Sequence, residues 1–484
     1  MSKNAMTKTL LPLLVSRARC RVHRNDITIQ GLSVFLNYDR VGHGSRRIDL
    51  DGNGGNNACL AEKIGHAIGN NTHLRKLRVK ISRVYQANMD AILFFVGLAQ
   101  NQSIEYLELD NVYPNLGCFI KNNTNLRCIK SMYPCGEEFI PSITSTLLES
   151  KVNRFERICL SQTKVADIVL ADLINALNAA FRLCNLSDLE VGWNKTLAWK
   201  GCKALGKLLE NSKCQLQSLT LSATSINDKC IDLLTRGLLM RNTIKILHIG
   251  FLARVTPIGW RSFFSTYLAN SKCSLRTIDL SDNNIGDDGL ICLGQYIASN
   301  MNSTLTGLEL TEPELYQEYN TKKKFRYTTV GWSGFSSALL VGAPTLKIVK
   351  LDLTGADMND EGGTGVMSAL VKIPSVKSVN LWDTSIGASG WASCFQLMID
   401  NGFTFEELIL TENNINDVGA ALLFELLGAN KTLKTLDLKD NQDITTAGWI
   451  ACFRLLLDSG SSVENLFLIP TILTMKVLHY WFIS

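Results

Sequence analysis

One stretch of this chain of 484 residues decides its fold, and it reads LRTIDLSDNNI at residues 275–285. In it, the apolar residues Ile278 and Leu280 alternate with polar ones, a pattern of period two that is typical of a short strand with one buried side. Asn283 falls where the chain leaves the strand, and its amide can satisfy turn backbone groups that no neighbouring strand reaches. The stretch therefore predicts a strand that ends in a tight turn.

The same stretch recurs roughly every 29 residues, so the sequence is a repeat array. After each turn comes a helix start signal such as INDVG at 415–419, in which we expect the Asp to cap the helix that it begins. Apolar residues then follow at helical spacing, for example Trp391, Cys394 and Phe395. The copies start at Leu74, Ile104, Phe155, Leu186, Leu216, Ile244, Leu275, Leu305, Leu346, Val376, Phe405, Leu433 and Val463.

The period, the Asn or Thr at the turn and the helix entry together resemble the ribonuclease-inhibitor-like class of leucine-rich repeats. The resemblance covers residues from about 45 to the end. It implies an α/β leucine-rich repeat solenoid, or horseshoe, with a parallel β-sheet on the concave face and α-helices on the convex face. It also implies protein binding and little more, because the class includes inhibitors, GTPase-activating proteins and the recognition regions of innate immune receptors.

We therefore expect a non-enzymatic protein-interaction module or scaffold, acting as a monomer. Two alternatives stay open, a protein that activates or otherwise regulates a GTPase and the sensing region of a receptor of the innate immune type. A GTPase regulator of this class acts by orienting its partner's own catalytic groups, so it need not show a catalytic motif.

Composition and motifs argue against several other functions. The 49 Lys+Arg and 44 Asp+Glu give a formal net charge of +5, which is not the strongly basic balance of a nucleic-acid-binding protein. The sequence holds no Walker loop, nucleophile elbow or zincin helix, and its histidines show no metal spacing. DLDGNG at 49–54 imitates half a calcium loop, but Leu60 stands where the bidentate Glu belongs. We name no catalytic, cofactor-binding or metal-binding residue, and expect no cofactor, nucleic acid or membrane.

The 14 cysteines and the recurrent tryptophans are interpreted as core residues. Cys202, Cys394 and Cys452 each follow a Trp by three residues, and no Cys-x-x-Cys pair occurs. So many free thiols favour a reducing compartment, and we expect the cytoplasm. The N-terminus is basic and free of acids up to Asp26, which leaves a mitochondrial leader as the alternative. The tryptophans expected to pack against the sheet are Trp260, Trp332, Trp391 and Trp449.

The candidate binding surface consists of the residues that flank the buried positions of each strand and therefore point to the concave face. From Asp188 onward acids dominate it, against few bases, chiefly Arg157, Lys350 and Lys439, so we expect a partner with a basic surface. Trp382 and Phe467 add aromatic area. The candidate contact residues are Asp188, Glu190, Asp279, Asp282, Glu309, Glu312, Asp352, Trp382, Asp383, Glu407, Glu412, Asp437 and Asp440, together with Lys322, Lys323 and Lys324 in an insertion.

The expected organisation is an N-terminal cap or leader at residues 1–44 and a repeat domain at 45–484. Three parts of the repeat domain are irregular. The repeat is degenerate at 113–150, an insertion at 311–330 lengthens the interval from Leu305 to Leu346, and the end at 469–484 is apolar. Insertions in repeat proteins lie in loops, often on the binding side. The apolar end is interpreted as a cap, an interface or a shifted reading frame.

Overall fold

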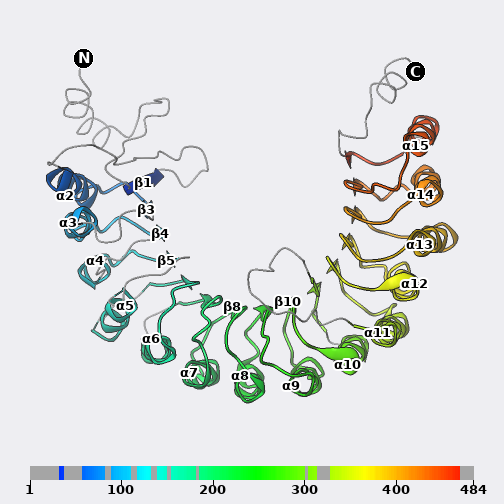
Figure 1. Cartoon of the computed structure of the whole chain (residues 1–484). Coiled ribbons are helices and arrows are strands. Elements are labelled where there is room, and N and C mark those ends of the chain that lie inside the picture. Colours follow the sequence, from blue (N-terminus) through cyan, green and yellow to red (C-terminus); the bar gives the residue numbers. More distant parts are fainter. Residues whose placement is uncertain are drawn as a thin grey trace, which may run out of the picture. The chain divides into compact units, whose positions relative to one another are not determined.

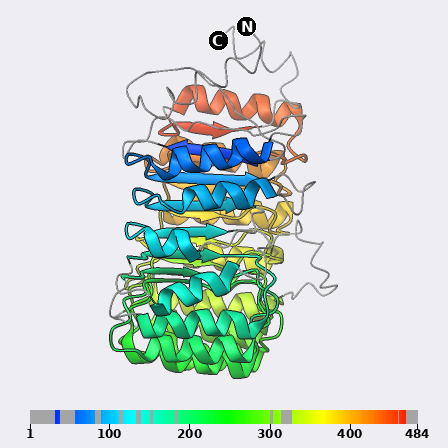
Figure 2. The ribbon, with the colours of Figure 1, turned by 90° about the vertical axis from the view of Figure 1, so that its left-hand side faces the viewer.

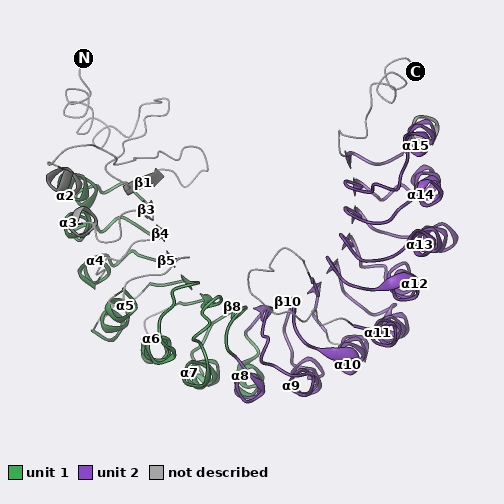
Figure 3. Cartoon of the chain, in the orientation of Figure 1, with its two compact units in different colours: residues 1–225, 236–243 green, residues 226–235, 244–484 purple. Residues whose placement is uncertain are grey.

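The computed structural model describes residues 32–37, 57–81, 89–110, 117–131, 139–149, 154–180, 185–299, 303–312, 327–459 and 461–468. The chain divides into two compact units (Figure 3). Unit 1 comprises residues 1–225 and 236–243, and unit 2 comprises residues 226–235 and 244–484. Helix α8 (Asp228–Arg241) contributes its beginning to unit 2 and its end to unit 1.

Unit 1 alternates strands with helices along the chain, and Figure 2 shows its helices stacked in successive layers. Its strands are β1 (Leu32–Asn37), β3 (Lys76–Ile81), β4 (Tyr106–Asp110), β5 (Cys128–Ser131), β6 (Arg157–Leu160), β7 (Asp188–Glu190) and β8 (Ser218–Thr220). Its helices are α2 (Asn57–Gly69), α3 (Met89–Leu98), α4 (Gly117–Asn122), α5 (Phe139–Glu149), α6 (Asp167–Ala180) and α7 (Trp199–Glu210). Strands β3 to β8 pair in parallel and in chain order, whereas β1 runs antiparallel to β3.

Unit 2 repeats the same alternation more regularly, with its strands on one side and its helices on the other (Figure 1). Its parallel strands are β9 (Ile246–His248), β10 (Thr277–Asp279), β11 (Gly307–Glu309), β12 (Lys350–Asp352), β13 (Ser378–Asn380), β14 (Glu407–Ile409), β15 (Thr435–Asp437) and β16 (Asn465–Phe467). Its helices are α9 (Pro257–Phe263), continued by the π-helical turn η1 (Phe264–Leu268), α10 (Gly286–Ser299), α11 (Thr329–Gly342), α12 (Asn359–Leu370), α13 (Ala388–Asn401), α14 (Asp417–Ala429) and α15 (Thr446–Ser459). Both units confirm the predicted α/β solenoid.

The period-two pattern of the sequence fixes which side of each strand is buried. In β10 the middle residue, Ile278, is fully buried, whereas Thr277 and Asp279 are half-buried on the opposite side. The strands β7, β13 and β15 show the same alternation. The first and third residues of these strands are therefore available for contact with another molecule.

The Asn at the strand exit ties each repeat to the one before it, as its predicted role requires. Asn283 is buried, and its amide nitrogen donates to the carbonyl of Leu280 in its own repeat at 2.8 Å and to that of Ile249 in the previous repeat at 2.9 Å. Asn194 and Asn441 make the equivalent pair of bonds. Because unpaired buried backbone groups are costly, these side chains hold the turns in a single conformation.

The Asp of the helix start signal caps the next helix and not its own, so that prediction was wrong. In α14 the cap is Asn416, whose side chain accepts from the backbone nitrogen of Gly419 at 3.0 Å. Asp417 instead reaches the start of the following helix, where its two carboxylate oxygens accept from the nitrogen and hydroxyl of Thr445, each at 2.7 Å. The corresponding residues Asp167, Asp228, Asp287 and Asp360 bind the starts of α7, α9, α11 and α13 in the same way.

This arrangement explains the Gly at the start of α13 and of α15, each of which receives an Asp from an earlier helix. A Cβ added to Gly448 would lie 2.0 Å from an oxygen of Asp417, and one added to Gly390 would lie 2.6 Å from an oxygen of Asp360. Only a residue without a side chain lets the carboxylate approach the helix start, where the helix dipole favours a negative charge.

The tryptophans and cysteines lie in the core, as predicted. Trp260, Trp332 and Trp391 are fully buried and Trp449 is nearly so. The structure describes the side chains of ten cysteines, and none of these forms a disulfide bond. Eight of them are buried, Cys202, Cys394 and Cys452 included. They act as small apolar side chains.

The irregular parts of the array come out differently. Leu351 pairs with Leu308 in the parallel register. Three residues before each of them lie Ile348 and Leu305, which therefore occupy the same position of the repeat. The repeat start predicted at Leu346 was two residues too early. The region predicted to be degenerate keeps a strand, because β5 pairs with both β4 and β6, but its helix α4 has only six residues. Most of the insertion, residues 313–326, and the apolar end at 469–484 lie outside the described residues.

No helix in the described ranges combines the length and apolar character that a membrane span requires.

Candidate functional site

The candidate site is the strand face of unit 2, which we define as the first and third residues of β9–β16 and the turn residue three positions after each strand. The parallel register aligns these residues in rows. The first residues are Ile246, Thr277, Gly307, Lys350, Ser378, Glu407, Thr435 and Asn465. The third residues are His248, Asp279, Glu309, Asp352, Asn380, Ile409, Asp437 and Phe467. The turn residues among the described positions are Phe251, Asp282, Glu312, Gly355, Asp383, Glu412 and Asp440.

Ten of the predicted contact acids belong to these rows. Asp279, Glu309, Asp352 and Asp437 are third residues, Glu407 is a first residue, and five more acids are turn residues. Within the rows the only lysine or arginine is Lys350. The structure therefore brings together acids that lie one or more repeats apart in the sequence.

Several of these acids are already partly neutralised or hydrogen-bonded within the chain. Asp437 forms an ion pair with Lys439, with 2.7 Å between the carboxylate oxygen and Nζ, and Glu309 lies 3.5 Å from Nζ of Lys350. Asp352 accepts from the hydroxyl of Thr354 at 2.7 Å, and Glu407 accepts from the hydroxyl of Ser378 at 2.6 Å. These contacts orient the carboxylates, and the two lysines reduce the charge that a partner would meet.

Four of the acidic turn residues share an unusual backbone conformation. Asp282, Asp383 and Glu412 each have φ of 53°, and Asp440 has φ of 57°, in the left-handed region. Most residues with a side chain avoid this region, and Asp and Asn tolerate it best. Glu412 is exposed, whereas Glu312 is buried, with 8% of its surface accessible.

Asp282 has a strongly perturbed carboxyl group. Burial, and then the nearby negative charge of Asp279, raise the pKa of Asp282 to about 7. Its Oδ2 is buried and has no hydrogen-bond partner in the described structure. Tyr327 is buried beside the acids Glu312 and Asp282, and burial raises the pKa of its hydroxyl.

Replacing Asp282 by Asn is expected to stabilise the protein more at pH 8 than at pH 5. The raised pKa means that the folded state holds a proton that the unfolded state loses near pH 4, so stability falls as the pH rises from about 4 to about 7. An Asn has no such charge. The melting temperature of the wild type and the variant, measured at both pH values, tests this.

Asp440→Asn is the control, because it changes the same residue type at the same left-handed turn position. Any benefit that Asn gains from that backbone conformation appears in both variants and at both pH values. If Asp282→Asn and Asp440→Asn respond to pH alike, the burial of the Asp282 charge is not the cause.

Two predicted acids lie in unit 1, whose strand face has mixed charge. Asp188 forms an ion pair with Arg157, with 2.7 Å between Oδ2 and Nε. Glu190 accepts from the hydroxyl of Ser161 and from the thiol of Cys159, the latter at 2.8 Å. In this unit basic residues of the strands pair with the acids, among them Arg157, one of the few bases expected on this face.

The predicted aromatic contacts differ in exposure. Phe467 is 44% exposed, and Nζ of Lys439 lies 4.8 Å from the centre of its ring. Trp382 is half-buried beside the turn residue Asp383. The predicted contacts Lys322, Lys323 and Lys324 lie outside the described residues.

The sequence analysis missed His248, which belongs to the row of third residues. Its Nδ1 lies 3.5 Å from Oδ2 of Asp279. The signal was present, because His248, Asp279 and Glu309 occupy the same position of three consecutive repeats, but metal spacings are usually sought within a single short segment.

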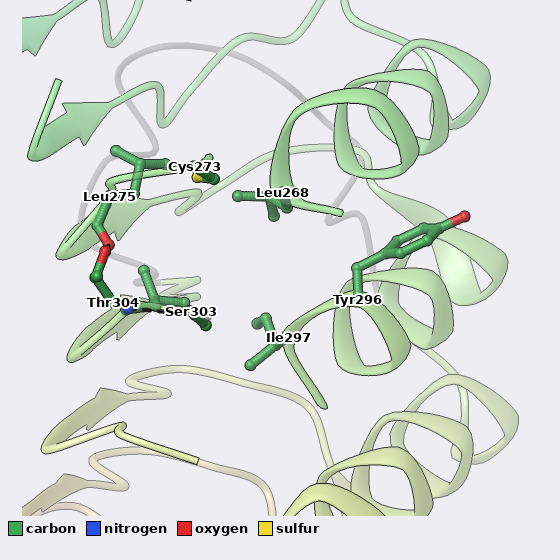
Figure 4. A pocket seen from close by; sticks show the side chains of 8 residues that line it. Leu268, Cys273, Leu275, Tyr296, Ile297, Ser303 and Thr304 are labelled. Carbon is green, nitrogen blue, oxygen red and sulfur yellow. Dashed lines mark hydrogen bonds between the residues drawn. The ribbon is translucent and has the colours of Figure 1, made fainter. Parts of the chain in front are cut away.

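A cavity in unit 2 lies away from the strand face, between the ends of η1, α10 and the strands β10 and β11 (Figure 4). Leu268, Cys273, Leu275, Tyr296 and Ile297 line it, with Ser303 and Thr304 at the side. Its volume of about 10 Å³ is about that needed for one water molecule. It is a packing defect of the core and too small for an organic ligand.

Comparisons with known proteins agree with the repeat structure. The model of the family described as "Leucine Rich repeat" matches residues 271–294, 403–424 and 429–451. The ribonuclease inhibitor of Sus scrofa is 24% identical over 455 residues, which cover 86% of this chain and 87% of that protein. "NACHT, LRR and PYD domains-containing protein 13" of Homo sapiens is 26% identical over 295 residues, which cover 58% of this chain and 27% of that protein.

Among solved structures, the leucine-rich repeat-containing protein LegL7 from Legionella pneumophila aligns with a TM-score of 0.37 and 16% identity, over 68% of this chain and 87% of that one. The family-model matches and the similarity to ribonuclease inhibitor support a leucine-rich repeat protein that resembles the ribonuclease-inhibitor-like class. This fold supports a protein-interaction module in general.

Proposed function

We propose that the chain is a non-enzymatic interaction module that binds a basic surface of a protein partner through the strand face of unit 2. The observation that carries the proposal is the charge of this face, where ten acids share the rows with a single lysine. A face with one sign of charge raises the rate of encounter with a partner of the opposite sign and orients it.

Acids alone give little affinity, so apolar groups must supply the rest of the binding energy. Phe467 is an exposed aromatic residue at one end of the rows, and Trp382 contributes a half-buried ring near their middle. We assign the steering of the partner to the turn acids Glu412 and Asp440 and the anchoring to these two rings.

The proposal includes a reducing compartment, the cytoplasm. The free thiols support it, because burial raises the pKa of several of them, including Cys394 and Cys452, each to about 12, and such thiols serve packing rather than disulfide exchange.

A charge-reversal variant of the strand face tests the proposal. In Glu412→Lys/Asp440→Lys, two turn acids of adjacent repeats become basic. The matched control Glu361→Lys/Glu425→Lys makes the same change of net charge on the helix side, where both residues are exposed. Each protein is used to capture partners from a cell lysate at low salt, and the captured proteins are identified by mass spectrometry.

We expect a set of basic proteins that the wild type and the control retain and that the strand-face variant loses. The affinity of such a partner, once purified, is expected to fall about tenfold or more in the strand-face variant. Binding is also expected to weaken at 1 M salt, because dissolved ions at this concentration screen the attraction between charges beyond about 3 Å. Equal retention by all three proteins would refute the proposal, and capture of a small GTPase would favour the regulatory alternative.

A further inference from the structure

Three potential metal ligands lie together at one end of the strand face. His248, Asp279 and Glu309 are the third residues of β9, β10 and β11, and the register aligns Asp279 with both of the others. One ligand atom from each residue lies within 4.8 Å of the other two. Their side chains are 33%, 16% and 27% exposed, so they are partly shielded from water but accessible from outside.

The spacing of these atoms is compatible with coordination of one ion. Zn²⁺ binds imidazole nitrogen and carboxylate oxygen at about 2.0–2.2 Å in tetrahedral geometry, so two ligand atoms of one ion are about 3.4 Å apart. Closing the cluster from a spacing of up to 4.8 Å therefore requires pairs of ligand atoms to approach each other by up to about 1.4 Å. Glu309 has the longest side chain of the three and can make most of this adjustment.

The donor set distinguishes this cluster from the other acids of the face. Carboxylates alone suit Ca²⁺ or Mg²⁺, whereas an imidazole together with carboxylates suits a borderline ion such as Zn²⁺. Elsewhere in the row of third residues, Asp352 lies between Glu309 and Asn380, and Asp437 lies between Ile409 and Phe467. No other histidine of the described ranges belongs to this row.

Two glycines lie beside the cluster. A Cβ on Gly250 would lie 3.0 Å from the carbonyl oxygen of Ser281 and 3.2 and 3.3 Å from the two carboxylate oxygens of Asp279, so the Asp279 carboxylate packs against this glycine. Gly307, the first residue of β11, places no side chain between Thr277 and Lys350 in its row. Lys350 now lies near Glu309, but its side chain is 51% exposed and can swing into solvent when a cation replaces it.

We propose that His248, Asp279 and Glu309 form a binding site for a divalent transition-metal ion of the Zn²⁺ type. The imidazole and the two carboxylates supply three ligands, and water completes the coordination. The site does not depend on the proposed protein partner, so each proposal can fail without the other.

Titration of the purified full chain with Co²⁺ tests the site, because Co²⁺ occupies zinc sites and gives visible absorption bands that report its ligands. The test variants are His248→Gln and Glu309→Gln. The matched control is Asp437→Asn, at the same strand position in β15, where the neighbouring third residues offer no metal ligand. Melting temperatures without metal confirm that each variant is folded.

We expect one equivalent of Co²⁺ to bind the wild type and Asp437→Asn, and Zn²⁺ to displace it. In His248→Gln and Glu309→Gln the affinity is expected to fall about tenfold or more, since even the loss of a residue that merely supports a metal ligand costs this much. Bound Zn²⁺ should also raise the melting temperature of the wild type and not that of His248→Gln. Absence of binding, or binding that His248→Gln and Glu309→Gln leave unchanged, would overturn the assignment.

Discussion

Replacing Asn413 by Ala is expected to lower the free energy of unfolding by about 3–5 kcal/mol. Asn413 is buried between two repeats. Its amide nitrogen donates to the carbonyl of Leu381 at 2.8 Å, and its Oδ1 accepts from the backbone nitrogen and the hydroxyl of Thr384, at 3.2 and 3.0 Å. Ala leaves these groups buried without their partner, which costs more than the loss of an exposed hydrogen bond.

The neighbouring residue provides the control. Asn414 is exposed, and its side chain makes one long hydrogen bond, to the carbonyl of Ile386 at 3.4 Å. Asn414→Ala is therefore expected to cost under about 1 kcal/mol. Urea unfolding followed by circular dichroism compares the two variants. If they lose equal stability, the buried Asn does not hold the repeats together.

Gly448→Ala is expected to destabilise the protein by about 2–4 kcal/mol, although Ala ordinarily favours a helix over Gly by about 1 kcal/mol. The new methyl group would lie 2.0 Å from an oxygen of Asp417 and would displace this carboxylate from the start of α15. The helix would lose the two hydrogen bonds of Thr445 to Asp417 and the favourable charge at its N-terminus. Thermal and urea unfolding measure the loss.

Gly419 is the matched control, because it is the third residue of α14 as Gly448 is of α15. The residue that corresponds to Asp417 in the preceding helix is Ala388, and the atom nearest to a Cβ on Gly419 is a methyl carbon of Ile415 at 3.3 Å. Gly419→Ala is expected to be neutral or stabilising. In a background of Asp417→Ala, Gly448→Ala should also lose most of its effect, and additive effects of these two substitutions would contradict the cap between repeats.

The sequence predicted the parts of the fold that repeat within one period. The alternation around Ile278, the buried Asn283 and the packing of Trp391 follow from the pattern of polar and apolar residues alone. The role of Asp417 did not follow, because its partners lie one repeat later and a capping residue is ordinarily sought at the start of its own helix. The repeat start was predicted at Leu346 and lies at Ile348. Both residues are apolar and two positions apart, so the period-two pattern fits either of them almost equally well.

The sequence predicted which residues make up the candidate site, but not which of its acids form ion pairs within the chain. The acids of unit 2 lie in rows, as alternation requires, but the pattern could not show which of them have partners within the chain. Asp188 is paired with Arg157 and Asp437 with Lys439, and these pairs depend on side-chain reach across or along a strand. The perturbed Asp282 and the neighbouring His248 likewise emerge only when adjacent repeats are placed side by side.

Carboxyl labelling of the chain with and without its captured partner tests the central claim most directly. A carbodiimide couples an amine to accessible Asp and Glu side chains, and mass spectrometry gives the extent at each residue. We expect the partner to protect Glu412, Asp440 and Asp352 on the strand face of unit 2 and to leave Glu361 and Glu425 on the helix side labelled as before. Protection of the two helix-side residues, with the strand-face acids still labelled, would contradict it.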